Sequence, residues 1–243
     1  MTCSCGAFGN TVDQHFTAEK VAKELRQYRR KGPGPPTRRL RDGLASAGLR
    51  QGTVLDVGGG LGVLSLELLD LGMDRATVVD ASSAYLAAAS HEAIKRERLA
   101  AVQFVHGDFL VVAGQLAPST VVALDRVVCC YPCYGPLLEQ AVQHAEHGVA
   151  LSYPRDRWYV RLGVWLENAL RRRRGNPFRT FVHPPLEMTR TIERAGFMLA
   201  SRRRTLSWSS DVFVKPPDPY GPRCVIADDE RLRGFLQPEE GSV

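Results

Sequence analysis

Three aspartates stand at the ends of three successive short apolar runs, and a cluster of glycines follows the first of them. Asp56 lies in TVLDV and is followed by GGGLG at residues 58–62, Asp80 ends ATVVD, and Asp108 comes after VQFVH and one glycine. Carboxylates accept hydrogen bonds from the hydroxyl and ammonium groups of a ligand, and glycines let the backbone pass close to it. The pattern therefore predicts a small-molecule binding site built from three turns.

The glycine turn does not have the spacing of a phosphate-binding loop. A dinucleotide site requires G-x-G-x-x-G, but in the three possible registers a required glycine is replaced by Val63, Leu61 or Ser65. No lysine follows the glycines as it does in a P-loop. Nucleotide phosphates are therefore not the expected ligand of this turn.

A second group with chemical potential is the run RVVCCYPCY at residues 126–134. Cys130 and Cys133 have the C-x-P-C spacing of a thioredoxin-type redox centre. A zinc site would need four ligands, and Cys3 and Cys5 could complete one only if the amino-terminal segment folded inward. We expect these cysteines to line a pocket, with core packing and metal or redox chemistry as the alternatives, and we expect no bound metal.

The elements that must position these residues alternate along the chain. Apolar runs that read as strands are separated by helical patterns, which predicts a parallel sheet with helices on both faces. The expected strands are 53–57, 76–80, 102–106, 121–125 and 148–153, followed by an antiparallel pair in FMLASRR and SWSSDVFVK. Helical patterns cover 11–31 (with a possible capping box of Thr11 and Gln14), a short segment from Thr37, the segment up to Leu71, 82–98, 137–144, 158–174 and 186–195.

Composition places the chain among ordinary globular proteins. The 243 residues are 44% hydrophobic and 24% charged, with a net charge of +6, and no apolar run reaches the roughly 20 residues of a membrane span. The amino terminus lacks the pattern of a secretory signal, so a cytoplasmic protein with six reduced cysteines is expected. Basic clusters at 29–31, 171–174 and 202–204 suit a solvated face, or an anionic substrate, an acidic membrane surface or nucleic acid.

The turn D-x-G-x-G-x-G, the aspartate that ends the second strand and the G-D-F run at 107–109 resemble the class I S-adenosylmethionine-dependent methyltransferases. An acid beside the glycines suits a cofactor that carries an ammonium and a sulfonium but no phosphate. The resemblance implies a doubly wound, Rossmann-like α/β fold with a mostly parallel sheet of about seven strands, the last antiparallel. It also implies S-adenosyl-L-methionine as the cofactor, bound by Asp56, Gly58, Gly60, Gly62, Asp80, Ala81, Asp108, Phe109, Arg126 and Tyr28.

The later part of the chain is similar to the magnesium-protoporphyrin O-methyltransferase group, a small-molecule branch of that family. The likeness lies in Tyr131-Pro132, in the aromatic and basic stretch 153–158, and in the R-x-F-x-H segment 179–183. That group has a histidine directly before its Tyr-Pro, whereas this chain has Cys130. The likeness therefore implies a small-molecule acceptor without implying a porphyrin.

Methyl transfer is an in-line displacement at the sulfonium methyl, so positioning supplies much of the acceleration. A general base is needed only if the acceptor must lose a proton. The candidate catalytic residues are His183, Tyr131 and Asp125, and the expected substrate pocket is lined by Cys130, Tyr131, Tyr134 and Trp158.

We expect an amino-terminal helical lid segment (1–50), a methyltransferase domain (51–215) with a helical insertion at about 156–190, and a tail (216–243). The expected function is a small-molecule methyltransferase in biosynthetic or secondary metabolism. The alternatives are a lipid or quinone methyltransferase at a membrane surface and a non-catalytic, cofactor-binding partner subunit. No nucleic acid is expected, because no Asn-Pro-Pro-Tyr or Asp-Pro-Pro-Tyr run follows strand four; weak membrane contact and a monomer or homodimer are expected.

Overall fold

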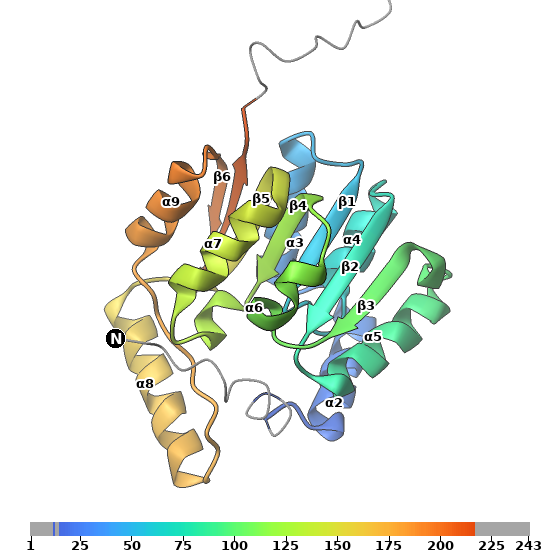
Figure 1. The fold of residues 1–243 in the computed structure, drawn as a ribbon. Coiled ribbons are helices and arrows are strands. Elements are labelled where there is room, and N and C mark those ends of the chain that lie inside the picture. The colour runs from blue at the N-terminus through green and yellow to red at the C-terminus, as the bar shows by residue number, and fades with distance from the viewer. Residues whose placement is uncertain (1–11, 13–14, 217–243) are drawn as a thin grey trace, which may run out of the picture.

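A seven-stranded sheet runs through the centre of the protein in a computed structural model that describes residue 12 and residues 15–216. Its strand order is β3-β2-β1-β4-β5-β7-β6 (Figure 1). β7 is antiparallel to β5 and β6, and the other pairs are parallel. The strands are β1 Thr53–Val57, β2 Arg75–Asp80, β3 Val102–His106, β4 Ser119–Asp125, β5 Ala145–Pro154, β6 Met198–Arg204 and β7 Trp208–Val214. The predicted fold class is confirmed.

Helices cover both faces of this sheet, as the alternation predicts (Figure 1). They are α2 Ala18–Lys31, α3 Pro35–Ser46, α4 Val63–Asp70, α5 Ser83–Lys95, α6 Phe109–Val112, α7 Tyr134–His144, α8 Trp158–Arg173 and α9 Pro185–Arg194, with short 3-10 turns that include η4 Val128–Cys130. Thr17 caps α2 by accepting from the Lys20 amide. The predicted capping box of Thr11 and Gln14 lies outside the described residues, as does all but the first residue of the predicted tail.

The core lies on both faces because side chains along each strand alternate in direction. Leu55, Val122 and Leu124 belong to one buried cluster, which α7 and α9 complete. Val54 and Val121 belong to the other, which α3 and α4 complete. α3 lies in the region expected as a lid, yet it packs on the sheet through two fully buried leucines, Leu40 and Leu44.

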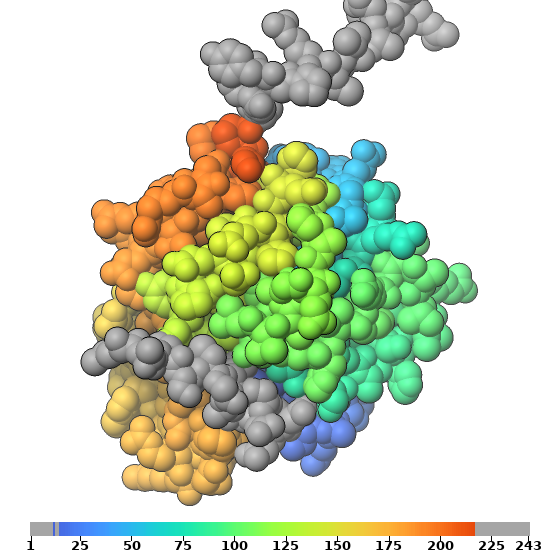
Figure 2. All heavy atoms as spheres, in the orientation of Figure 1, coloured from blue at the N-terminus to red at the C-terminus, as the bar shows by residue number. Residues whose placement is uncertain are grey.

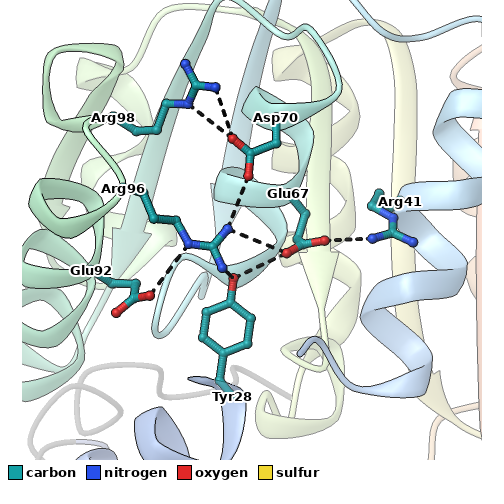
Figure 3. A network of polar contacts seen from close by, with 7 residues as sticks. All are labelled: Tyr28, Arg41, Glu67, Asp70, Glu92, Arg96 and Arg98. Atoms are coloured by element: carbon teal, nitrogen blue, oxygen red, sulfur yellow. Dashed lines mark hydrogen bonds and ion pairs between the residues drawn. The ribbon is translucent and has the colours of Figure 1, made fainter. Parts of the chain in front are cut away.

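A network of charged side chains ties α2 to α3, α4 and α5 (Figure 3). The Glu67 carboxylate lies at its centre: it accepts from the Tyr28 hydroxyl at 3.3 Å and pairs with Arg41 at 2.7 Å and Arg96 at 3.6 Å. The Arg96 guanidinium also donates to the Tyr28 hydroxyl. The full set is Tyr28, Arg41, Glu67, Asp70, Glu92, Arg96 and Arg98. The network therefore attaches α2 to the three neighbouring helices through side chains of the protein itself.

We expect Tyr28→Phe to lower the free energy of unfolding by about 1 kcal/mol, because it removes a hydroxyl that is bonded in a half-buried network. Urea denaturation measures the change. Tyr159→Phe is the matched control, since its hydroxyl donates to the Leu206 carbonyl at the surface. An equal loss in the two variants would contradict a structural role for the network.

Candidate active site

A cavity of about 200 Å³ lies at the carboxyl ends of β1, β2 and β4. Parallel strands bring their carboxyl ends to one edge of the sheet, where open α/β sheets bind ligands. Figure 1 shows α2 and α8 beyond this edge. The predicted site residues that line the cavity are Asp56, Gly58, Gly60, Asp80, Ala81, Phe109, Asp125, Arg126, Cys130 and Tyr131.

The glycine turn forms one wall of the cavity, and its backbone explains why glycine is needed. Gly58 and Gly60 have φ angles of 62° and 55°, in the left-handed region that side chains disfavour. A Cβ on Gly58 would also lie 2.2 Å from Cγ2 of Val127. The turn can therefore pack against the loop after β4 only without a side chain. Gly62 begins α4 from just outside the cavity.

Asp56 places a buried carboxylate, with one oxygen that can still accept a hydrogen bond, on the same wall. Its side chain is 1% exposed, Oδ2 accepts from the Ser65 hydroxyl at 2.8 Å, and Oδ1 has no hydrogen-bond partner among the described residues. Burial raises the pKa of Asp56 to about 7, and the carboxylates of Asp125 and Asp80 add to the effect. A cation placed at Oδ1 would satisfy the orphaned atom, so the site fits the ammonium of an amino-acid moiety.

Asp80 holds the turn and lines the cavity at once. Its two carboxylate oxygens accept from the amides of Gly60 and Ser82, each at 2.8 Å. Because this carboxylate lines the cavity and accepts hydrogen bonds, Asp80 suits a pair of ribose hydroxyls. Beside it, the buried ring of Phe109 offers an apolar surface for an adenine.

Two of the predicted cofactor residues point elsewhere. Asp108 caps α6 through the Leu110 amide at 3.1 Å and accepts from the Tyr131 hydroxyl at 2.6 Å, and it does not line the cavity. Tyr28 joins the network around Glu67, so the interpretation of Tyr28 as a cofactor contact is not supported. Glu24, one helical turn earlier on α2, lines the cavity instead and accepts from the Tyr85 hydroxyl at 2.7 Å.

Sequence reasoning missed the aromatic wall of the cavity. Phe16, Tyr85 and Phe178 come from three distant segments and line it together. The Phe16 ring centroid lies 5.0 Å from that of Tyr85 and 5.4 Å from that of Phe178. Only Tyr85 had a local signal, because it follows the Ser82 cap at the carboxyl edge of β2.

The loop after β4 is strained where it meets the cavity. Arg126 has a φ of 61°, which is costly for a residue with a side chain. Its amide donates to the Ser152 hydroxyl at 2.9 Å, and its carbonyl accepts from the thiols of Cys129 and Cys130 at 3.4 and 3.6 Å. These contacts hold Cys130 against the cavity, as the pocket-lining interpretation predicts.

The cysteines do not form a metal site with other described side chains: within residues 12 and 15–216, no group of three or more His, Cys, Asp or Glu could hold a metal ion. Cys129 and Cys130 are free thiols, consistent with the expectation of reduced cysteines. Cys133 is disulfide-bonded, so that expectation is wrong for this residue.

His183 is a structural residue by its contacts. It is buried, its Nε2 donates to the carbonyls of Tyr131 at 2.9 Å and Val128 at 3.2 Å, and it does not line the cavity. Burial lowers the pKa of His183, which favours the neutral ring. The side chain therefore positions η4 and the residues after it, and is not placed to remove a proton from a ligand.

Two residues expected in the substrate pocket also lie outside the cavity. The Tyr134 hydroxyl donates to Glu187 at 2.7 Å, with its ring against His183. Trp158 is 75% exposed, because it belongs to a face of α8 that points away from the protein.

Tyr131 and Asp125 are the remaining catalytic candidates. Tyr131 has its hydroxyl bonded to Asp108, and burial raises its pKa far above the usual range. Asp125 lines the cavity.

Residues 54–147 match a family model described as a methyltransferase domain. This segment, which runs from β1 into β5, is similar to methyltransferase domains. Its fold is similar to magnesium protoporphyrin IX methyltransferase from Synechocystis PCC 6803, solved with bound SAH, at 18% identity and a TM-score of 0.66, covering 85% of this chain and 99% of that one. Human N-acetylserotonin methyltransferase in complex with SAM is similar at 18% identity and a TM-score of 0.58, covering 83% and 57%.

An O-methyltransferase family protein from Burkholderia thailandensis matches this methyltransferase fold at 14% identity and a TM-score of 0.65, covering 86% of this chain and 63% of that one. Comparison with curated protein sequences found no significant match. Every helix within the described residues falls short of the length and apolar character that a membrane span needs. The predicted methyltransferase domain is confirmed over residues 54–147, and the solved structures share its fold.

The raised pKa of Asp56 predicts a pH-dependent stability in the absence of ligand. Between the ordinary value of 3.8 and about 7, the folded chain binds a proton that the unfolded chain has released, so stability falls as pH rises through this window. Asp56→Asn removes the loss and should be more stable than the wild type at pH 8, by up to about 4 kcal/mol.

Urea denaturation at pH 5, 6, 7 and 8 measures this difference, which should grow with pH. Glu139→Gln, at an exposed position on α7, is the control and should give a constant difference. An Asp56→Asn difference that is the same at pH 5 and pH 8 would show that Asp56 is ionised throughout.

Proposed function

We propose that this chain is an S-adenosylmethionine-dependent methyltransferase that acts on a small-molecule acceptor. The observation that carries the proposal is the cavity at the sheet edge, where the orphaned oxygen of Asp56, the glycine turn and the Asp80 carboxylate converge. Asp56 would hold the ammonium of the cofactor, Asp80 its ribose, and Phe109 its adenine. When bound, the cofactor supplies a methyl group on a sulfonium.

A second cavity of about 550 Å³ adjoins the first and is our candidate for the acceptor site. The two cavities share Glu24, Leu61, Val63 and Arg126 as lining residues. Lys31, Arg38 and Arg126 bring three positive charges to the second cavity, against the one carboxylate of Glu24. Lys31 and Arg38 pair with no carboxylate among the described residues. An acceptor with a carboxylate, a phosphate or an acidic phenol fits this lining.

Asp125 is the best-placed candidate base, because it lies in the wall between the two cavities. Its carboxylate lines the first cavity and accepts from the hydroxyls of Thr37, which lines the second, and Ser152. Thr37 is thus the one hydrogen-bonded residue between an acceptor in the second cavity and a carboxylate that can take its proton. The aromatic wall would keep water away from the methyl group, because transfer of that group to water would compete with transfer to the acceptor.

S-adenosylhomocysteine should bind the purified chain in the micromolar range or tighter. Asp80→Ala should weaken binding by about 1–3 kcal/mol, because buried hydrogen bonds are lost. Titration calorimetry measures both affinities. Tyr159→Phe is the control and should bind as the wild type does, because Tyr159 lines neither cavity and its hydroxyl bonds to the Leu206 carbonyl. Absence of binding by the folded wild type would overturn the cofactor assignment.

Turnover with labelled S-adenosylmethionine should be confined to acceptors that carry a negative group. In a panel of matched acids and neutral amides, the double variant Lys31→Gln, Arg38→Gln should raise KM about tenfold or more and leave kcat within about twofold. The control is Arg26→Gln, Arg30→Gln, which removes the same charge from exposed positions of α2 outside both cavities. Equal turnover of neutral acceptors would refute the acceptor class while leaving the methyltransferase assignment intact.

A lipid or quinone methyltransferase at a membrane surface is the second candidate, because α8 exposes a stripe of large apolar side chains. Product formation with any acceptor separates both enzymes from a non-catalytic partner subunit, which would bind S-adenosylhomocysteine without turnover.

A further inference from the structure

α8 exposes its apolar face instead of burying it. Trp158, Leu162, Trp165, Leu166 and Leu170 lie on one side of the helix and are 75%, 48%, 64%, 49% and 51% exposed. Figure 2 shows α8 in the lobe that protrudes at the lower left of the molecule. Soluble proteins rarely leave such a contiguous set of large apolar side chains uncovered. We call these five residues the α8 stripe.

The opposite face of α8 is fixed to the protein, so the stripe is held outward. Val160 is the buried residue of the helix. The Asn168 amide donates to the Thr180 carbonyl at 2.7 Å and accepts from the Thr180 amide at 3.0 Å. Arg171 donates to the Thr180 hydroxyl at 2.7 Å and lies over the Phe178 ring at 5.1 Å. A helix that closed as a lid over either cavity would have to rotate and break all of these contacts.

Arginines surround the stripe at both ends. Arg157 and Arg161 lie at the amino-terminal end, and residues 172–174 are three further arginines at the other. Arg161 pairs with Asp156 at 2.5 Å, whereas Arg157 and residues 172–174 pair with no carboxylate among the described residues. Leu206, on the turn between β6 and β7, is 77% exposed, and its carbonyl accepts from the Tyr159 hydroxyl at 2.8 Å. The turn that carries this exposed apolar side chain is therefore bonded to α8 at the residue after Trp158.

The charges decide what covers the stripe. In a symmetric dimer through α8, an antiparallel pair would place the 172–174 end of one helix against Arg157 and Arg161 of the other, and a parallel pair would place 172–174 against itself. Net positive charge meets net positive charge in either case, because Asp156 offsets only one of the two arginines at the amino-terminal end. Whatever covers the stripe must therefore offer an apolar surface to the five large side chains and negative charges to the arginines at both ends. Helices that lie in a lipid interface are rich in tryptophan, leucine and arginine.

We propose that α8 docks in the plane of an anionic lipid surface. The 16-residue helix is too short to cross a bilayer, and its fixed orientation presents the stripe without unfolding any other element. The tryptophans enter the headgroup region while the arginines contact lipid phosphates and carboxylates. This inference does not rest on the proposed enzymatic activity, because it concerns a surface outside both cavities.

Co-sedimentation with vesicles of phosphatidylglycerol and phosphatidylcholine tests the proposal with the full chain. We expect binding to these vesicles at physiological salt, weaker binding as salt rises, and little binding to vesicles of phosphatidylcholine alone. The double variant Trp158→Ser, Trp165→Ser should lose binding to the anionic vesicles. The triple variant with glutamine at 172–174 should weaken binding by up to about a hundredfold, since each basic residue near the surface contributes about fivefold.

The matched control is Lys23→Gln, Arg26→Gln, Arg30→Gln, which removes the same charge from exposed positions of α2. It should bind anionic vesicles nearly as the wild type does. Three results would overturn the proposal: no binding to anionic vesicles by the folded wild type, equal loss in the control and the 172–174 variants, or a dimer in sedimentation equilibrium that the tryptophan variant dissociates. Circular dichroism confirms that each variant is folded.

Discussion

Parallel pairing of β1 with both β2 and β4 is the constraint from which the site follows. Because the three strands run in one direction, Asp56, Asp80 and Asp125 reach the same edge although they are distant in sequence. Parallel strands buried on both faces leave only their ends for polar chemistry. The same pairing brings three carboxylates close together, and the charges of Asp80 and Asp125 help to raise the pKa of Asp56.

Several energetic costs coincide at this edge. Asp56 is buried with one oxygen unpartnered, Arg126 has a left-handed backbone, and Gly58 packs where no side chain fits. Outside functional sites, a fold usually avoids such features. The Asp56 cost is the most informative, because a bound cation would remove it, whereas an added hydrophobic contact would not. The local instability and the capacity to bind a charged ligand therefore have one cause.

Sequence patterns predicted what is local and missed what depends on tertiary contacts. The glycine turn and the acids at strand ends were predictable, because each signal lies within a few residues of its strand. On α2, Glu24 lines the first cavity and Tyr28 lines only the second, since periodicity does not say which helical turn faces a given cavity. The sequence predicts His183 as a candidate base, but its ring donates to two backbone carbonyls that are distant in sequence. The α8 stripe has the spacing of a core helix, and amphipathic spacing is the same whether the apolar face meets protein or lipid.

Residues 176–183 connect the surface helix to the interior of the site. Thr180 bonds to α8, Phe178 lines the first cavity, the Phe181 amide donates to the Cys129 carbonyl at 2.8 Å, and His183 donates to the residues around η4. One face of the segment therefore holds α8, and the other holds the loop that carries Cys130 and Tyr131. Because both sets of contacts involve the backbone of a single short segment, α8 cannot shift far without moving a wall of the cavity. Whatever covers the α8 stripe thus acts on an element that the site shares, while the sheet and its aspartates stay fixed.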